Sequence, residues 1–180
     1  MDFFSCDAGQ CAMIAKQCPE GAVVLDKEQG STGRILFRPT LMLAGHGLEL
    51  LLKACMYWNG KPPKTSGPQG HDILALWSEE ICEPIRGNVF ANAIKVATAA
   101  RETHDYPDNP RDEEVLPLIE EYVLALGNLH GVRGYPLRYP SSREHLAPRT
   151  PFLVKSLHAT ADDFVKRPNE FKLIRFRGED

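Results

Sequence analysis

The chain has 180 residues, of which 43% are hydrophobic and 25% charged, and its formal net charge is −3. These values are typical of one soluble globular domain. The slightly negative net charge excludes a protein that binds nucleic acid over its whole surface. No apolar run approaches the ~18–20 residues that span a bilayer, and the N-terminus lacks the basic and apolar regions of a secretory signal, so we expect a cytoplasmic protein without a membrane segment.

The five cysteines are interpreted as reduced thiols of a cytosolic protein, because an odd number does not make a closed disulfide framework. Cys6, Cys11 and Cys18 match no compact zinc or iron–sulfur motif, so we expect no metal site and no cofactor. Residues 133–180 are basic on an otherwise acidic chain. This uneven charge distribution indicates either a local surface that faces an anionic ligand or an ordinary C-terminal helix in solvent.

The first predicted elements are a short helix over residues 6–18 and a turn-rich connector over residues 19–38. The connector contains Pro19 and three glycines, and an extended piece is expected near residues 22–25. A long helix over residues 39–58 follows. Pro39 can begin this helix because its missing N–H would be free there in any case, and Asn59-Gly60 is a typical helix end.

The helix over residues 39–58 is apolar on nearly every side, which is typical of a helix buried in a core or at a subunit interface. Helical spacing places His46, Glu49 and Lys53 on one line. Glu49 precedes Lys53 by four residues, the favourable orientation for an ion pair. Because ionisable groups on such a helix must be paired or used, this polar stripe is a candidate binding seam.

The segment over residues 61–70 is predicted to be a rigid loop, since it holds three prolines and two glycines. Lys61 and Lys64 lie in it and are candidate phosphate ligands, or simply solvated lysines. His71 or Asp72 then begins the next helix. His71 at a helix N-terminus could contact a phosphate or a base, whereas a plain capping role is the alternative.

The rest of the chain predicts further helices separated by irregular segments, with a basic tail at residues 171–177 that forms either a short strand or a partner segment. The predicted helices cover residues 73–81, 89–100, 112–129 and 152–165, and Pro117 must lie in a first turn or kink its helix. The sequence therefore predicts an all-α fold: a bundle of four main helices with additional short helices, in which helices 39–58 and 112–130 are the central pair.

Three short motifs resemble the HEPN superfamily: Glu49-x-x-x-Lys53, Gly70-His71-Asp72 and Arg138-Tyr139-Pro140. HEPN domains are small, α-helical, often dimeric, and often tied to RNA cleavage or nucleotide handling. The resemblance covers about residues 39–145. It implies an antiparallel HEPN-like bundle in a single domain over residues 1–180, with residues 146–180 as a C-terminal helix and basic tail.

The same resemblance implies a homodimer that binds RNA, a nucleotide or a partner protein, such as an antitoxin or a nucleotidyltransferase-type protein. The candidate ligand-binding residues are Glu49, Lys53, Lys61, Lys64, His71 and Asp72. This interpretation is that of a binding protein without ribonuclease activity. A helical scaffold without a ligand, in which the polar stripe is only an ion-pair network, is an alternative.

A second alternative is a metal-independent endoribonuclease of toxin or phage-defence type. HEPN ribonucleases resemble one another in a motif in which four to six residues separate an Arg from a His, and six residues separate Arg138 from His145. The His would activate the ribose 2′-hydroxyl and the Arg would stabilise the phosphorane charge. Tyr139 departs from the polar residue that the family prefers after the Arg, and Pro140 interrupts the segment.

The Arg-Tyr-Pro tripeptide also recurs in HEPN relatives that lack catalytic activity. Arg138 therefore has a structural interpretation as well, in which it lies in a turn and anchors a carboxylate such as that of Glu49 or Asp72. Both interpretations of Arg138 stay open on the sequence alone.

Overall fold

The computed structural model describes residues 2–103, 110–131, 136–139 and 144–173, together with all their side chains except those of residues 30, 33, 68 and 69. Across these residues the chain is helical and contains no strand, so the predicted all-α fold is confirmed. The α-helices are α1 (Asp7–Thr32), α2 (Phe37–Trp58), α3 (Ile73–Ser78), α4 (Glu83–Thr103), α5 (Asp112–His130) and α6 (Thr150–Lys166). Short 3-10 helices are η1 (Phe3–Ser5), η2 (Gly33–Leu36), η3 (Pro68–His71), η4 (Glu80–Cys82) and η5 (Pro168–Phe171).

The first helix is much longer than the sequence predicts. α1 continues through Pro19 to Thr32, so the predicted connector over residues 19–38 and its extended piece near residues 22–25 are wrong. A proline inside a helix loses a hydrogen bond and crowds the preceding turn. Here its ring packs against α2 at Gly47, where an added Cβ would lie 2.6 Å from Pro19 Cδ. The packing of Pro19 on α2 thus outweighs the tendency of a proline to end a helix.

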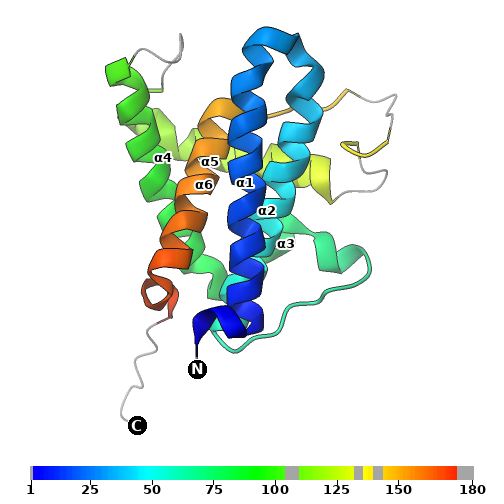
Figure 1. The fold of residues 1–180 in the computed structure, drawn as a ribbon, viewed down its shortest axis with the longest axis vertical. Helices are drawn as coiled ribbons and strands as arrows, with labels where there is room; N and C mark the ends of the chain where they lie inside the picture. Colours follow the sequence, from blue (N-terminus) through cyan, green and yellow to red (C-terminus); the bar gives the residue numbers. More distant parts are fainter. Residues whose placement is uncertain (1, 104–109, 132–135, 140–143, 174–180) are drawn as a thin grey trace.

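α1 and α2 form a long helical hairpin, joined through η2 and lying side by side along the molecule (Figure 1). The predicted central pair of helices 39–58 and 112–130 is therefore wrong, because α2 packs mainly along α1. Pro19 predicts a helix end near residue 18, and a helix of that length would be too short to pair along the whole of α2. α5 instead packs against α4 and α3 and meets α2 near the end that carries His130.

The ends of α2 and α3 follow the local signals. α2 begins two residues before Pro39, which therefore lies in the first turn. It ends at Trp58 and is capped by Asn59, which is followed by Gly60 with a left-handed φ of 77°. Asp72 caps α3, since its side chain accepts a hydrogen bond from the Ala75 N–H at 3.0 Å. The capping role considered for Asp72 is thus confirmed.

The later helices differ from prediction mainly at their ends. α3 stops at Ser78 rather than at residue 81, and α4 begins at Glu83, so that Pro84 is in its first turn. Pro117 lies in the second turn of α5 rather than in its first. α6 matches the predicted helix over residues 152–165 to within two residues at each end. Of the basic tail at residues 171–177, only residues 171–173 are among the described residues.

The hydrophobic core extends beyond residues 39–145. Phe3 packs edge-on against Trp58, with ring centroids 5.0 Å apart, and Phe164 packs on Phe171 at 4.6 Å. Trp58 also donates a hydrogen bond from Nε1 to the Pro168 carbonyl at 2.8 Å. Segments from both ends of the described chain therefore share one core with α2.

One helical stretch among the described residues, Arg34–Trp58, is long and apolar enough to cross a membrane. Half of its most apolar window is buried within the bundle, and it carries the buried ion pair of Glu49 and Lys53. Core helices of soluble proteins pass the same length and hydropathy test. The packing of this stretch against α1 is consistent with such a core helix.

Candidate functional site

The centre of the candidate site is the carboxylate of Glu49, which lies in the middle of α2 and is only 2% exposed. Lys53 Nζ donates to Oε1 at 2.6 Å, confirming the predicted ion pair. His130 Nε2 lies 2.9 Å from Oε2, and His71 Nδ1 lies 3.1 Å from Oε1 and 3.3 Å from Oε2. These four residues are the Glu49 cluster. A buried charge requires such partners, and the cluster supplies them from three separate segments.

The cluster keeps Glu49 ionised. Burial alone would raise the pKa of this carboxyl, but the hydrogen bonds and charges of His130 and Lys53 outweigh burial and lower the pKa from 4.5 to about 2. Because Glu49 is a carboxylate at neutral pH, each neighbouring imidazole nitrogen must donate its proton to it. The tautomers of His71 and His130 are thus set by Glu49.

Two glycines let the histidines approach α2. The His130 ring lies against Gly45, one helical turn before Glu49, where an added Cβ would be 2.6 Å from the ring Nδ1. Gly131, directly after α5, lies so close to η3 that an added Cβ would be 2.4 Å from the His71 carbonyl oxygen. The end of α5, the segment that carries His71 and the middle of α2 therefore meet at one point.

His71 presents a reactive edge to solvent. Its side chain is 39% exposed, and its Nδ1 faces Glu49. The two nitrogens lie on opposite edges of an imidazole, so Nε2 is directed away from the carboxylate. When neutral His71 donates from Nδ1, its outer Nε2 is a proton acceptor. A carboxylate that fixes an imidazole in this way is the usual means of orienting a general base or a ligand-binding histidine.

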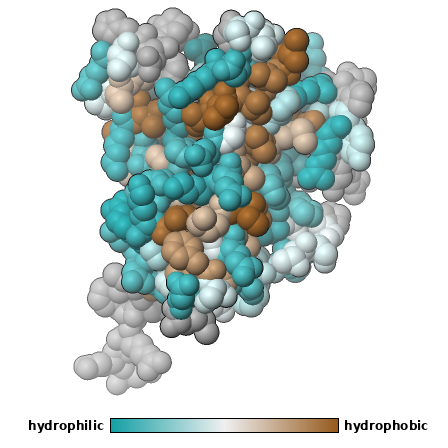
Figure 2. Space-filling view, viewed as in Figure 1, coloured by the Kyte–Doolittle hydropathy of each residue, from teal (hydrophilic) through white to brown (hydrophobic). Residues whose placement is uncertain are grey.

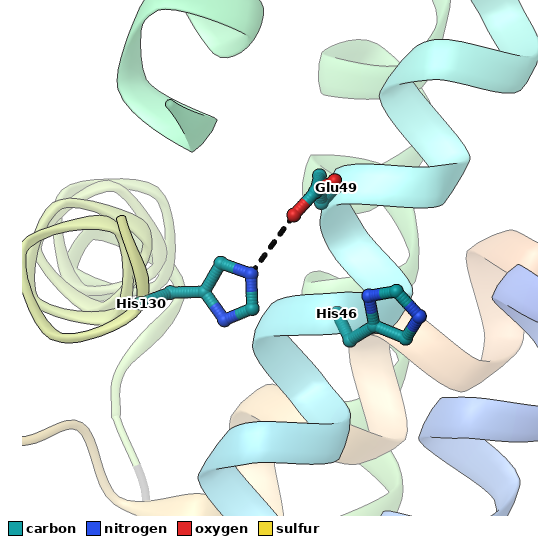
Figure 3. A group of neighbouring side chains, drawn as sticks. All are labelled: His46, Glu49 and His130. Atoms are coloured by element: carbon teal, nitrogen blue, oxygen red, sulfur yellow. Dashed lines mark hydrogen bonds and ion pairs between the residues drawn. The ribbon is translucent and has the colours of Figure 1, made fainter. Parts of the chain in front are cut away.

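His46 lies at the rim of the cluster. His46 is exposed and lies three residues before Glu49 on α2 (Figure 3). Partial burial lowers the pKa of His46 and the charge of Glu49 opposes this, while the charges of His130, Lys53 and Arg138 lower it further. His46 is thus mainly neutral at pH 7. Arg138 is exposed, and its charge is one of those that lower the pKa of His46.

The other predicted site residues are distributed more widely. Lys61 forms an exposed ion pair with Glu79 at 2.6 Å, and the Asp72 carboxylate caps α3. Lys64 is exposed on the loop between α2 and η3. His145 is also exposed, and the segment that joins it to Arg138 includes residues 140–143, which lie outside the described residues.

Sequence reasoning found Glu49, Lys53 and His71 but missed His130. His130 is 81 residues from Glu49 in the chain and is the last residue of α5. A basic residue at a helix C-terminus is favoured by the helix dipole alone, so its position carried no functional signal. Only the folding of α5 onto α2 reveals its role.

Comparison of the chain with models of protein families, with curated proteins and with solved structures gives no match. The resemblance to the HEPN superfamily therefore depends on the three short motifs alone.

Proposed function

We propose that the Glu49 cluster and its rim bind the phosphate of a nucleotide or of RNA, in a HEPN-like helical protein that lacks ribonuclease activity. The observation that carries this proposal is the solvent-facing edge of His71, held in place by buried Glu49. Lys53 and three histidines lie around a single carboxylate, and the charge of Arg138 acts on one of these histidines. The site thus has more groups that can be cationic than it has acids, although the chain as a whole is acidic.

Each part of the site has a distinct role in this proposal. Lys53 is buried and engaged with Glu49, so it positions the carboxylate and adds positive potential. Arg138 is exposed, and a guanidinium can bind two phosphate oxygens at once. In the proposed site, His46 and the outer edge of His71 would hydrogen-bond to the ligand. Nucleotides and RNA share this phosphate chemistry, and the experiment below distinguishes them.

A metal-independent endoribonuclease is the second candidate function, because one observation favours it. RNA transesterification requires a base for the 2′-hydroxyl and a cation for the phosphorane. His71, oriented by Glu49, is suited to be the base, and Arg138 influences the same site. The pair predicted from sequence, Arg138 and His145, is the other possible catalytic pair for this activity.

We also propose that the protein is a cytoplasmic homodimer. All five cysteines are free thiols, as in proteins of a reducing compartment. On the face where α1 lies, hydrophobic side chains emerge between hydrophilic ones (Figure 2), and Met13, Ile14 and Val24 of α1 are exposed. A second copy of this chain is the partner that the family resemblance favours, and an antitoxin or nucleotidyltransferase-type protein is the alternative. Light scattering of the purified protein tests the dimer, and a monomer would contradict it.

Calorimetric titration in EDTA tests the proposed function. Adenosine 5′-monophosphate and a single-stranded oligoribonucleotide are titrated into wild type, His71→Ala and Arg138→Gln. We expect each substitution to weaken binding about tenfold or more, the usual cost of one charge-assisted hydrogen bond. Lys166→Gln is the control, because this exposed lysine pairs with Asp162 on α6.

The outcomes of this titration are distinct. Binding of the mononucleotide alone would identify a nucleotide site, and much tighter binding of the oligonucleotide would identify an RNA site. Cleavage of the oligonucleotide that disappears in His71→Ala or His145→Ala would establish the endoribonuclease instead. Equal affinities in wild type and in His71→Ala and Arg138→Gln, or no binding by any of them, would overturn the proposal.

A further inference from the structure

His46, Glu49 and His130 bring together three atoms that ligate transition metals. One imidazole nitrogen from each histidine and one carboxylate oxygen of Glu49 lie within 4.8 Å of one another. Figure 3 shows His130 reaching from the end of α5 toward Glu49, with His46 on the neighbouring turn of α2. We propose that these three residues bind a divalent transition metal of the zinc class, a function that does not depend on phosphate binding.

The required rearrangement is small. Ligands at about 2.0–2.1 Å from a tetrahedral zinc ion lie roughly 3.3–3.4 Å apart. Glu49 Oε2 and His130 Nε2 are already 2.9 Å apart, so they need to separate only slightly, and the metal replaces the proton that they share. His46 must move inward, and it is exposed, so its side chain has room to turn.

The surrounding groups orient the proposed ligands. Lys53 holds Oε1 of Glu49, which leaves Oε2 for the metal and favours binding through a single oxygen. The His130 ring is pinned against the Gly45 backbone, where no side chain competes for the space. Interactions of this kind around metal ligands fix their direction and raise affinity. Two of the three ligands are therefore held in place before any metal arrives.

The same geometry leaves one coordination position open. Two histidines and one carboxylate complete three of the four positions that zinc prefers, and the exposed His46 marks the side that faces solvent. Lys53 and Arg138 add positive charge near the metal, which lowers its affinity but favours an anionic fourth ligand. A water molecule, a hydroxide or another anionic oxygen suits this position.

Cobalt(II) titration in a phosphate-free, non-chelating buffer tests the proposal, because tetrahedral cobalt absorbs visible light strongly. We expect one Co²⁺ per chain, released by equimolar Zn²⁺. His46→Ala should weaken binding about tenfold or more, the scale on which ligand-set changes alter affinity. His158→Ala on α6 is the matched control and should bind as wild type does. His46 is exposed, so its removal does not disturb the core.

A second variant, Gly45→Ala, keeps every ligand but displaces the His130 ring, and it should also weaken cobalt binding. Circular dichroism checks that this variant is folded before its cobalt affinity is compared. Absence of visible bands, or equal affinity in wild type and His46→Ala, would overturn the proposal. Thiolate-to-cobalt charge-transfer bands would overturn it too, because they would show that the metal is bound by cysteine thiolates, such as the half-buried Cys6 or Cys11, and not by the proposed ligands. Since no phosphate is present, these results stand apart from the nucleotide titration in EDTA.

Discussion

His130, the last residue of α5, hydrogen-bonds to Glu49 in the middle of α2, across 81 residues of chain and a distance of 2.9 Å. The contact joins α2 to α5, two helices that pack against each other in the bundle. Because both side chains are buried, each supplies the hydrogen-bond partner that the other would otherwise lack. The stability of this end of the bundle and the geometry of the candidate site therefore depend on the same few atoms.

Glu49→Gln should destabilise the protein by about 3 kcal/mol or more, because it leaves Lys53 buried without a counter-charge. The double variant Glu49→Gln/Lys53→Met removes both charges and should recover much of that loss. Urea denaturation followed by circular dichroism measures both free energies of unfolding. A double variant no more stable than Glu49→Gln would show that the ion pair is not the source of the effect.

Stability should fall as the pH is lowered from about 4.5 to about 2. The pKa of Glu49 is lowered to about 2 in the folded protein, so in this window the unfolded chain binds the extra proton and unfolding is favoured. A pKa shift of this size contributes roughly 3 kcal/mol to the free energy of unfolding. This contribution is complete at pH values above the pKa of Glu49 in the unfolded chain. Denaturation at a series of pH values measures the slope. Glu49→Gln should have a shallower slope in the same window.

Gly45→Ala should destabilise the fold by about 1–3 kcal/mol, the usual cost of overpacking a tight site. The new methyl group would lie 2.6 Å from His130 Nδ1. Gly87→Ala is the matched control, because at this position in the second turn of α4 the nearest atom to the added Cβ is 3.9 Å away. That substitution should stabilise the protein by up to ~1 kcal/mol through helix propensity. Thermal denaturation compares the two, and equal shifts would contradict the close packing of His130 on Gly45.

Asp72→Ala should cost about 1 kcal/mol, because it removes the cap of α3. The effect should be local and include the neighbouring His71. Amide hydrogen exchange should show faster exchange at Ala75, whose N–H loses its acceptor, while exchange in α6 stays unchanged. Unchanged exchange at Ala75 would show that the cap contributes nothing to α3.

The fold class and the first half of the site could be predicted from sequence because their signals are local. The helical spacing of Glu49 and Lys53 predicts their ion pair, and Asp72 before an apolar run predicts a cap. Pro19 misled the same reasoning, because its tolerance inside α1 depends on Gly47 of another helix. His130 could not be assigned at all, since nothing near it in sequence indicates that α5 ends against α2.

The hairpin of α1 and α2 consists of neighbouring segments, so it can form early and quickly during folding. The contact between Glu49 and His130 instead closes a long loop. Closing this loop costs conformational entropy, which the contact offsets only after it has formed. Until α5 docks, the Glu49 carboxylate and the Lys53 amine belong to a partly built interior that water still reaches. Any activity of this site should therefore return in refolding experiments only with the slowest structural phase, after most of the helix signal has recovered.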